Sequence, residues 1–264
     1  MPAAMDLELR DKVCVVTGAS SGIGFETSRR LAAEGASVLM VARDAERLER
    51  AAAEIGADYV AGDVTDAELD ARVVATCAEQ MGGIDVLINN AGTSFAKSLD
   101  DLTDDDWRGQ WELHVMAPMR LMRAAAPRMA ARGGGRIVNV CSSAGKRPSL
   151  TNAAYSVTKA AQLSLSRVFA DTYAADGVLV NAVTPGAVAS PLWVGDGGLA
   201  DQTGEARGVS RERALEAQAD KIPLGRLAEP GEIADVILFL ASARASTVTG
   251  AAWSADGGTV AIIV

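Results

Sequence analysis

The sequence contains few of the residues that metal centres and disulfide frameworks require. It has a single histidine, His114, and three cysteines, which are scattered and odd in number. Zinc and di-iron sites use several such ligands, so the composition predicts no metal site. Cysteines without pairing or ligand spacing indicate free thiols in a reducing cytoplasm.

Basic charge and long apolar runs are also lacking. The net charge is −9 at pH 7, which provides no electrostatic surface for nucleic acid or for an anionic membrane. No apolar run approaches the ~20 residues of a membrane span. Residues 1–6 lack the basic and apolar regions of a signal peptide. We therefore expect a cytoplasmic protein that binds neither nucleic acid nor membranes.

Short apolar runs alternate with helical patterns along the 264 residues, 49% of which are hydrophobic. This alternation predicts an α/β fold, with a doubly wound parallel sheet in a single domain over residues 1–264. Between residues 187 and 222 the pattern loosens, which predicts a lid or binding loop inserted at the ligand edge of the sheet. The predicted strands are residues 12–16, 37–41, 59–61, 85–88, 136–140, 178–183 and 251–254. The predicted helices include residues 45–55, 66–80, 102–129, 211–220, 232–240 and one that ends near residue 173.

Three glycines follow the first predicted strand at residues 18, 22 and 24, and a helical pattern comes next. Glycines in such a turn let the backbone approach a pyrophosphate, and the helix N-terminus faces its negative charge. The turn therefore predicts a dinucleotide site, although its spacing differs from the commonest fingerprint.

The same turn also matches the nucleophile elbow of α/β-hydrolases, with Ser20 as the nucleophile. That fold needs a histidine late in the chain, after the serine and the acid. His114 lies in the middle of the chain, so an esterase remains a remote alternative.

Ala42 and Arg43 end the second predicted strand, where an acidic residue usually meets a free ribose 2′-hydroxyl. A guanidinium at this place suits a 2′-phosphate instead. Asp44 is better explained as the N-cap of the next helix. We therefore favour NADP(H) over NAD(H). The alternative is that Arg43 is a solvated charge at the start of that helix.

Tyr155 and Lys159 are four residues apart, in a stretch whose flanking alanines favour a helix. On a helix, two such side chains share one face. An ammonium favours the phenolate, so we expect the lysine to lower the tyrosine pKa toward the working range of an acid or base. Taken alone, the pair also fits an ordinary amphipathic helix with a packed tyrosine and an exposed lysine.

Together and in this order, the motifs resemble those of the short-chain dehydrogenase/reductase family over almost the whole chain. They are the glycine turn, Asp63-Val64, residues 89–92, Ser142, Tyr155-x-x-x-Lys159, Pro185-Gly186, and residues 223–226, 239–242 and 256–258. The resemblance is to 3-oxoacyl-[acyl-carrier-protein] reductases and carbonyl reductases. It implies a Rossmann-type, three-layer α/β/α domain, a small carbonyl or alcohol substrate, and a homotetramer. The apolar end, residues 260–264, is consistent with burial at a subunit contact.

The resemblance also implies roles for individual residues. Tyr155 is expected to be the general acid/base, Lys159 to hold the nicotinamide ribose and lower the tyrosine pKa, and Ser142 to hydrogen-bond the substrate oxygen. The other expected cofactor contacts are Gly18, Ser20, Ile23 and Gly24 at the pyrophosphate, Asp63 at the adenine, Asn90 at the adenosine ribose, Val188 and Ser190 at the nicotinamide, and also Ser21, Arg43, Val64, Ala91, Gly92, Pro185 and Gly186.

His114 departs from the family pattern. The framework around it, residues 111–115, places it where the family has a fourth catalytic residue, an asparagine that holds a water linking the lysine to bulk solvent. An imidazole can also donate and accept, so His114 could keep this relay while adding a dependence near pH ~6.5. Alternatively, His114 packs between helices at a subunit contact.

The sequence thus predicts an NADP(H)-dependent oxidoreductase that transfers hydride between nicotinamide and a ketone, aldehyde or secondary alcohol. The alternative is a dinucleotide-binding sensor or scaffold with the fold but weak or no turnover. The intact Ser142, Tyr155 and Lys159 argue against that alternative, and the altered residue 114 keeps it open.

Overall fold

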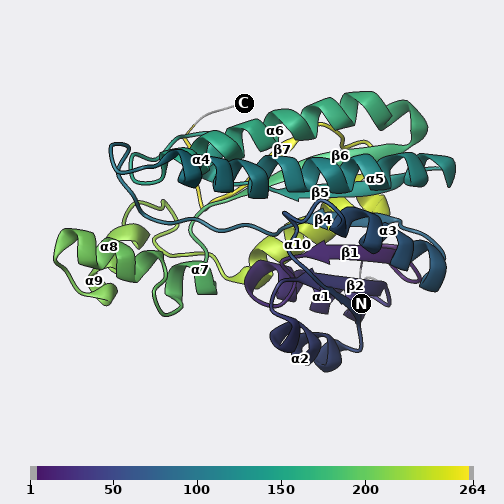
Figure 1. Cartoon of the computed structure of the whole chain (residues 1–264), viewed down its shortest axis with the longest axis horizontal. Coiled ribbons are helices and arrows are strands. Elements are labelled where there is room, and N and C mark those ends of the chain that lie inside the picture. The colour runs from purple at the N-terminus through teal and green to yellow at the C-terminus, as the bar shows by residue number, and fades with distance from the viewer. Residues whose placement is uncertain (1–4, 262–264) are drawn as a thin grey trace.

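A computed structural model describes residues 5–261 as a seven-stranded parallel sheet between two layers of helices (Figure 1). The strand order is β3-β2-β1-β4-β5-β6-β7. The strands are β1 Val13–Thr17, β2 Ser37–Ala42, β3 Asp58–Ala61, β4 Val86–Asn89, β5 Gly135–Val140, β6 Val178–Pro185 and β7 Ala252–Ala255. The chain reverses its direction of winding between β1 and β4. In such sheets, ligands bind outside the carboxyl ends of the strands at this reversal.

Apolar side chains on both faces of the strands explain the two helical layers. All five residues of β1 are buried, as are all four of β4. Helices α1 Gly22–Ala33, α2 Ala45–Ile55 and α10 Pro230–Ala241 pack on one face. Helices α3 Leu69–Gln80, α5 Ala117–Ala131 and α6 Ala153–Tyr173 cover the other. The predicted doubly wound, three-layer architecture is confirmed.

The helix from residue 45 to 55 was predicted with its true bounds, and its cap is also as predicted. The Asp44 side chain accepts a hydrogen bond from the Arg47 backbone N–H. This bond satisfies one of the unpaired amides of the first turn. The Asp44 carboxylate therefore serves as the N-cap of α2, as the sequence predicted.

The long helix predicted over residues 102–129 is present from residue 104 to 131, but its hydrogen-bond pattern changes in the middle. The structure has α4 Asp104–Trp111, a π-helical segment Glu112–Met116, and then α5. Thr103 caps α4 and shares a capping box with Asp106. Hydrophobic periodicity cannot distinguish α- from π-helical turns over five residues, which is why the sequence missed the change. π-helical turns of this kind are frequent at functional sites.

Three short helices make up the segment between residues 187 and 222, where the sequence predicted a lid or binding loop. They are α7 Pro191–Val194, α8 Leu199–Arg207 and α9 Arg211–Ala219. In Figure 1 this helical group lies beyond one edge of the layered body, beside the ends of the strands. It therefore contributes to the ligand side of the sheet.

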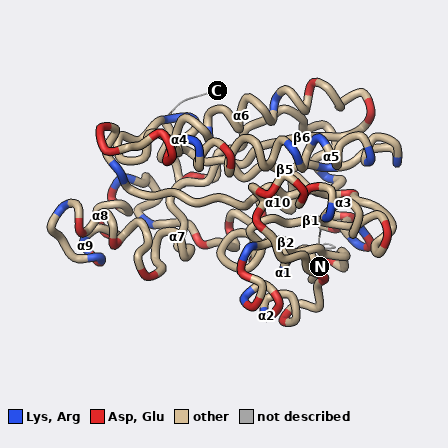
Figure 2. The backbone as a smooth tube through the Cα atoms, in the orientation of Figure 1, with Lys and Arg blue, Asp and Glu red and all other residues tan. Residues whose placement is uncertain are grey.

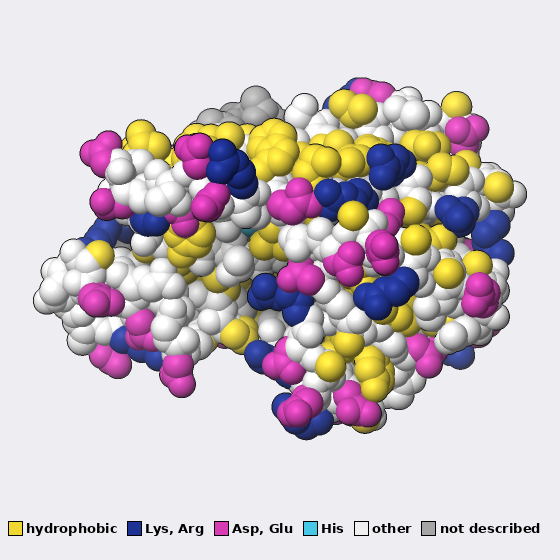
Figure 3. All heavy atoms as spheres, in the orientation of Figure 1, with side chains coloured by type: hydrophobic (Ala, Val, Ile, Leu, Met, Phe, Trp, Pro, Cys, Tyr) yellow, Lys and Arg dark blue, Asp and Glu magenta, His cyan; other side chains and the backbone are white. Residues whose placement is uncertain are grey.

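The surface carries both signs of charge. Segments with Lys and Arg are interspersed with segments of Asp and Glu over the chain in Figure 2. Hydrophobic side chains gather over α4 and α6 in Figure 3. By sequence position, Trp111 belongs to α4 and Val157 and Val168 belong to α6, and all three are exposed. Within residues 5–261, no helix is long and apolar enough to cross a membrane. The expectation for the apolar end falls mainly on residues 262–264, which lie outside the described residues.

Candidate active site

A cavity of about 700 Å³ lies at the carboxyl ends of the central strands. Glycine-turn residues and the ends of β4, β5 and β6 line one side, and α7 and α8 line the other. Most of the predicted site residues line it, namely Gly18, Ser21, Ile23, Arg43, Asn90, Ala91, Gly92, Ser142, Tyr155, Lys159, Pro185, Gly186, Val188 and Ser190. Ser20, Gly24, Asp63, Val64 and His114 are not among the lining residues.

The glycine turn between β1 and α1 has the backbone that the sequence predicted. Gly18 and Gly22 have φ values of +64° and +56°, in the left-handed region that favours glycine. A Cβ on Gly24 would lie 2.3 Å from the Gly18 carbonyl oxygen, so Gly24 closes the turn by tight packing. Among residues 5–261 no side chain caps α1, and its first residues line the cavity. Uncapped amides beside a glycine cradle fit the pyrophosphate of a dinucleotide.

Asn90 holds this turn against the end of β4. Its amide nitrogen donates to the backbone carbonyl oxygens of Thr17, at 2.9 Å, and Gly18, at 3.3 Å. The Thr17 hydroxyl accepts from the backbone N–H groups of Asn90 and Ala91, each at 3.0 Å. Asn90 thus stabilises the glycine turn and also lines the cavity.

Arg43 lies at the end of the cavity beside β2 and β3. Its guanidinium is 3.6 Å from the Asp63 carboxylate, and both side chains are substantially exposed. The other Asp63 oxygen accepts hydrogen bonds from the backbone and the hydroxyl of Thr65. With Asp44 engaged as a helix cap, Arg43 is the charged group at this end that lines the cavity, and it suits a 2′-phosphate.

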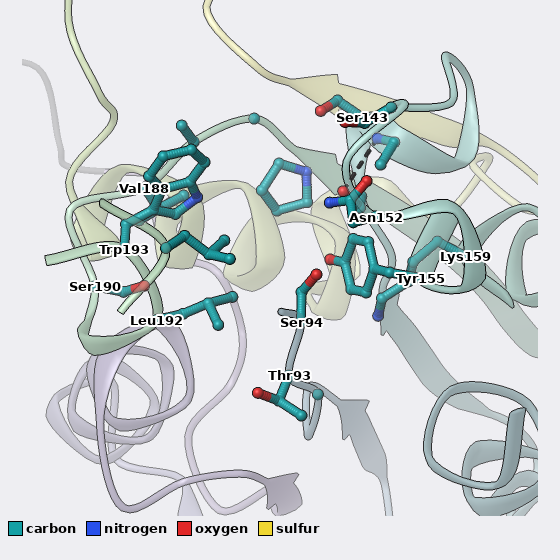
Figure 4. A pocket seen from close by; sticks show the side chains of 18 of the residues that line it. Thr93, Ser94, Ser143, Asn152, Tyr155, Lys159, Val188, Ser190, Leu192 and Trp193 are labelled. Carbon is teal, nitrogen blue, oxygen red and sulfur yellow. Dashed lines mark hydrogen bonds between the residues drawn. The ribbon is translucent and has the colours of Figure 1, made fainter. Parts of the chain in front are cut away.

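Ser142 and Tyr155 come together from β5 and α6. Ser142 follows the strand, and its hydroxyl accepts a hydrogen bond from the Ala144 backbone N–H. In Figure 4 the Tyr155 hydroxyl points into the cavity, across from Leu192 and Trp193. Burial raises the pKa of Tyr155 to about 12, and the adjacent Ser142 hydroxyl lowers it in part. The pKa of Tyr155 is therefore raised, which differs from the expected lowering by Lys159.

Lys159 is almost completely buried, with 2% of its surface exposed. Its ammonium donates to the Val140 carbonyl oxygen and to the Gln162 side-chain oxygen, each at 2.9 Å. It lies 5.6 Å from the centre of the Tyr155 ring. Burial lowers the pKa of Lys159 to about 8. These two acceptors hold the ammonium beneath the tyrosine ring.

His114 comes from the π-helical segment and lies against Tyr155. The two rings meet edge to face, with their centres 5.2 Å apart. The Thr158 hydroxyl, which donates to the Tyr155 carbonyl oxygen, lies 3.2 Å from His114 Nδ1. The Thr93 backbone N–H donates to Nε2 at 3.4 Å. These contacts fit a neutral ring with its proton on Nδ1, because Nε2 must then accept.

Burial and the nearby Lys159 charge lower the pKa of His114 well below its usual value. This differs from the sequence-based expectation of a charge change near pH ~6.5. The ring lies in the protein interior, its nitrogens already paired as acceptor and donor, and an added proton would have to displace the Thr93 contact. The esterase alternative finds no support here, because Ser20 does not line the cavity and the histidine contacts Thr158 and Thr93 instead.

The variant His114→Asn is expected to have the same pH–rate profile as the parent between acid and neutral pH, because the buried ring stays neutral over that range. Its stability should respond to pH differently. The unfolded chain binds one more proton than the native parent as pH falls below ~6.5, so the parent loses about 1.4 kcal/mol of unfolding free energy per pH unit. The asparagine variant lacks this dependence.

Urea unfolding at several pH values measures the difference cleanly, because His114 is the only histidine in the chain. Parallel stability curves for the two proteins, or profiles of activity that diverge near neutral pH, would contradict a permanently neutral His114.

Two polar residues of the site were missed by the sequence reasoning. Gln162 follows Lys159 by three residues on α6 and is 2% exposed, so a polar residue at a buried helical position was the available signal. Ser94 comes shortly after the strand-end motif at residues 89–92. Its hydroxyl is buried and has no hydrogen-bond partner among the described residues. No sequence pattern distinguishes it from an ordinary loop serine.

Comparisons with known proteins agree with this geometry. A family model described as short chain dehydrogenase matches residues 12–196. Galactitol 2-dehydrogenase (L-tagatose-forming) of Cereibacter sphaeroides is 40% identical over 257 residues, which cover 94% of this chain and 95% of that protein. A 3-oxoacyl-[acyl-carrier-protein] reductase of Thermotoga maritima is 34% identical over 261 residues, covering 96% of this chain and 100% of that protein.

The crystal structure of L-sorbose reductase from Gluconobacter frateurii, complexed with NADPH and L-sorbose, superposes with a TM-score of 0.92. It is 37% identical and covers 98% of this chain and 100% of that chain. The family model spans well over half of the sequence, and relatives above the level of 30% identity match it almost from end to end. The chain therefore belongs to the short-chain dehydrogenase/reductase family of oxidoreductases.

Proposed function

We propose that the protein is an NADP(H)-dependent oxidoreductase that interconverts a ketone or aldehyde and the corresponding alcohol. The observation that carries this proposal is the placement of Ser142, Tyr155 and Lys159 in one cavity with the glycine turn. The glycine turn fits a pyrophosphate, and Arg43 at the far end fits a 2′-phosphate. The bound dinucleotide would supply or accept the hydride.

In reduction, the Tyr155 hydroxyl would donate its proton to the carbonyl oxygen, and Ser142 would orient that oxygen by a hydrogen bond. The raised pKa of Tyr155 keeps the phenol protonated at neutral pH, as a proton donor requires. As the proton leaves, the phenolate that forms would be stabilised by the Lys159 ammonium beneath its ring. In oxidation, the same groups would act in the opposite sense.

We propose a polyhydroxylated ketone or alcohol as the substrate class. The cavity has hydroxyl and amide groups from Ser94, Ser143 and Asn152 close to Tyr155 (Figure 4). The unpartnered, buried hydroxyl of Ser94 is costly unless a ligand satisfies it. Relatives that act on galactitol and L-sorbose support this class. A long 3-oxoacyl chain would leave these polar groups unpaired.

NADPH consumption tests the function, with ketohexoses, simple ketones and 3-oxoacyl thioesters offered in parallel. We expect oxidation of NADPH with at least one of these classes and the largest kcat/KM for a ketohexose. Tight NADPH binding without turnover of any carbonyl compound, and no oxidation of polyols with NADP, would favour the sensor or scaffold alternative.

The variant Ser94→Ala should raise KM for the preferred ketohexose about tenfold, because one hydrogen bond to a substrate hydroxyl is lost. The value of kcat/KM for an unsubstituted ketone such as cyclohexanone should stay unchanged. Ser98→Ala is the matched control, since Ser98 hydrogen-bonds Asp101 outside the cavity. A uniform loss across both ketones would contradict the assignment of Ser94 to substrate hydroxyls.

We also propose that the chain forms a homotetramer. The exposed apolar residues Trp111, Val157 and Val168 on α4 and α6 support self-association, because soluble monomers rarely expose contiguous apolar patches. Sedimentation equilibrium measures the assembly directly, and a mass of one chain at micromolar concentration would exclude it.

A further inference from the structure

Lys159 and Gln162 form a buried polar pair on α6. Residues three apart on a helix lie on one face, and the Gln162 side-chain oxygen accepts from the Lys159 ammonium at 2.9 Å. Each residue has 2% of its surface exposed. A buried charge is costly unless hydrogen bonds compensate for the lost water. In the protein interior, the amide acceptor of Gln162 therefore has a large effect on the stability of the Lys159 charge.

The charge of Lys159 is balanced by neutral groups alone. Its ammonium donates to the Val140 backbone oxygen and to Gln162, and it forms no ion pair among residues 5–261. The titratable groups that face it are His114 from the π-helical segment, Cys141 after β5, and Tyr155 on its own helix. His114 is neutral, and burial raises the pKa of the Cys141 thiol to about 12. Neither supplies a negative charge at neutral pH.

An ammonium has three N–H donors. Val140 and Gln162 take two of them, which leaves one for a ligand in the cavity that Lys159 lines. The Val140 acceptor is main chain and is present whatever the side chains are. Gln162 is thus the one side chain whose identity decides how well the ammonium is compensated.

We propose that Gln162 is a positioning residue that fixes the Lys159 ammonium beneath Tyr155 and keeps it protonated over the working pH range. The inference rests on the proposed function, because the protonated lysine is what stabilises the phenolate of Tyr155. Loss of the lysine charge as pH rises would end turnover, so the alkaline limit of activity reports on Gln162.

Two substitutions of Gln162 by side chains of similar length change the hydrogen-bond acceptor for Lys159 in opposite ways: one removes it and the other gives it a negative charge. Gln162→Met removes it with little change of shape, and the lysine pKa then falls, so the alkaline limb of kcat/KM for reduction should move down by about one pH unit. Gln162→Glu places a carboxylate beside the ammonium and raises the lysine pKa, so the limb should move up by a similar amount.

NADPH binding, followed by cofactor fluorescence from pH 7 to 10, provides a readout that needs no turnover. The pH at which NADPH affinity falls should move in the same direction as the kinetic limb of each variant, down for Gln162→Met and up for Gln162→Glu. The control is Ser166→Ala, which removes a buried hydrogen bond with Asn139 further along α6 and should leave the limb in place. Circular dichroism of each variant shows that it is folded.

Shifts of opposite sign in Gln162→Met and Gln162→Glu establish the role. Unchanged limbs, or shifts in one direction for both variants, would overturn it, because a merely structural residue changes the amplitude and not the pH dependence. Parent protein that binds NADPH but turns over no carbonyl compound would refute the proposed function alone, and the binding titration would still decide the role of Gln162.

Discussion

Tyr155→Phe is expected to lower kcat by about 10²- to 10⁴-fold while NADPH still binds, because the variant lacks the proposed proton donor. The phenyl ring keeps the edge-to-face contact with His114, whose ring centre lies 5.2 Å from that of Tyr155. It also keeps the hydrocarbon surface above Lys159. The substitution therefore removes the hydroxyl and little else, which makes the loss of rate interpretable.

Tyr173→Phe is the matched control for this experiment. Tyr173 ends the same helix and stacks on Phe169, far from the cavity lining. Both variants are compared by stopped-flow NADPH oxidation with the best carbonyl substrate and by cofactor fluorescence. A Tyr155→Phe enzyme that retains a tenth or more of the parent kcat would show that another group protonates the substrate.

The second large effect concerns the choice of cofactor. Arg43→Ala should weaken NADPH binding about 10- to 100-fold and leave NADH binding almost unchanged, because a charge-assisted contact to the 2′-phosphate is lost. Arg43 is largely exposed and its ion pair with Asp63 is long, at 3.6 Å, so the fold should not depend on it. Fluorescence titrations with both dinucleotides measure the ratio of affinities.

Arg50→Ala provides the control, since Arg50 is also exposed, in the middle of α2, and lies outside the cavity lining. It pairs with Glu46 one helical turn away. Equal losses for NADPH and NADH in Arg43→Ala would contradict recognition of a 2′-phosphate. A parent protein that binds NADH more tightly than NADPH would contradict the preference itself.

The layered fold was predictable because its signals are local. Buried parallel strands appear as short apolar runs, and the cap at Asp44 and the capping box at Thr103 mark helix starts by their own side chains. Gly18 and Gly22 likewise indicate a turn with positive φ values, which glycine adopts readily. Each of these features depends on neighbours in the chain, and so a single sequence contains them.

The parts that could not be predicted depend on tertiary contacts. The ammonium of Lys159 bonds to Val140, nineteen residues earlier in the chain. The burial that raises the Tyr155 pKa arises from several elements at once. Periodicity gave no sign of the short helices α7 and α8. The first has only four residues, and the second has few large apolar positions. The Tyr155–Lys159 motif predicted two residues that line the cavity, but their pKa values depend on the folded surroundings.

The π-helical turn before α5 has a consequence for how residue 114 is specified. Each residue of an α-helix advances by about 100°, so the wider turn at Glu112–Met116 rotates α5 and the residues after it relative to α4. A point substitution at His114 changes only the side chain that meets Tyr155. Removal of one residue from this turn would bring a different position of the chain to the tyrosine. Chain length in this segment, as well as residue type, therefore determines which side chain meets the tyrosine.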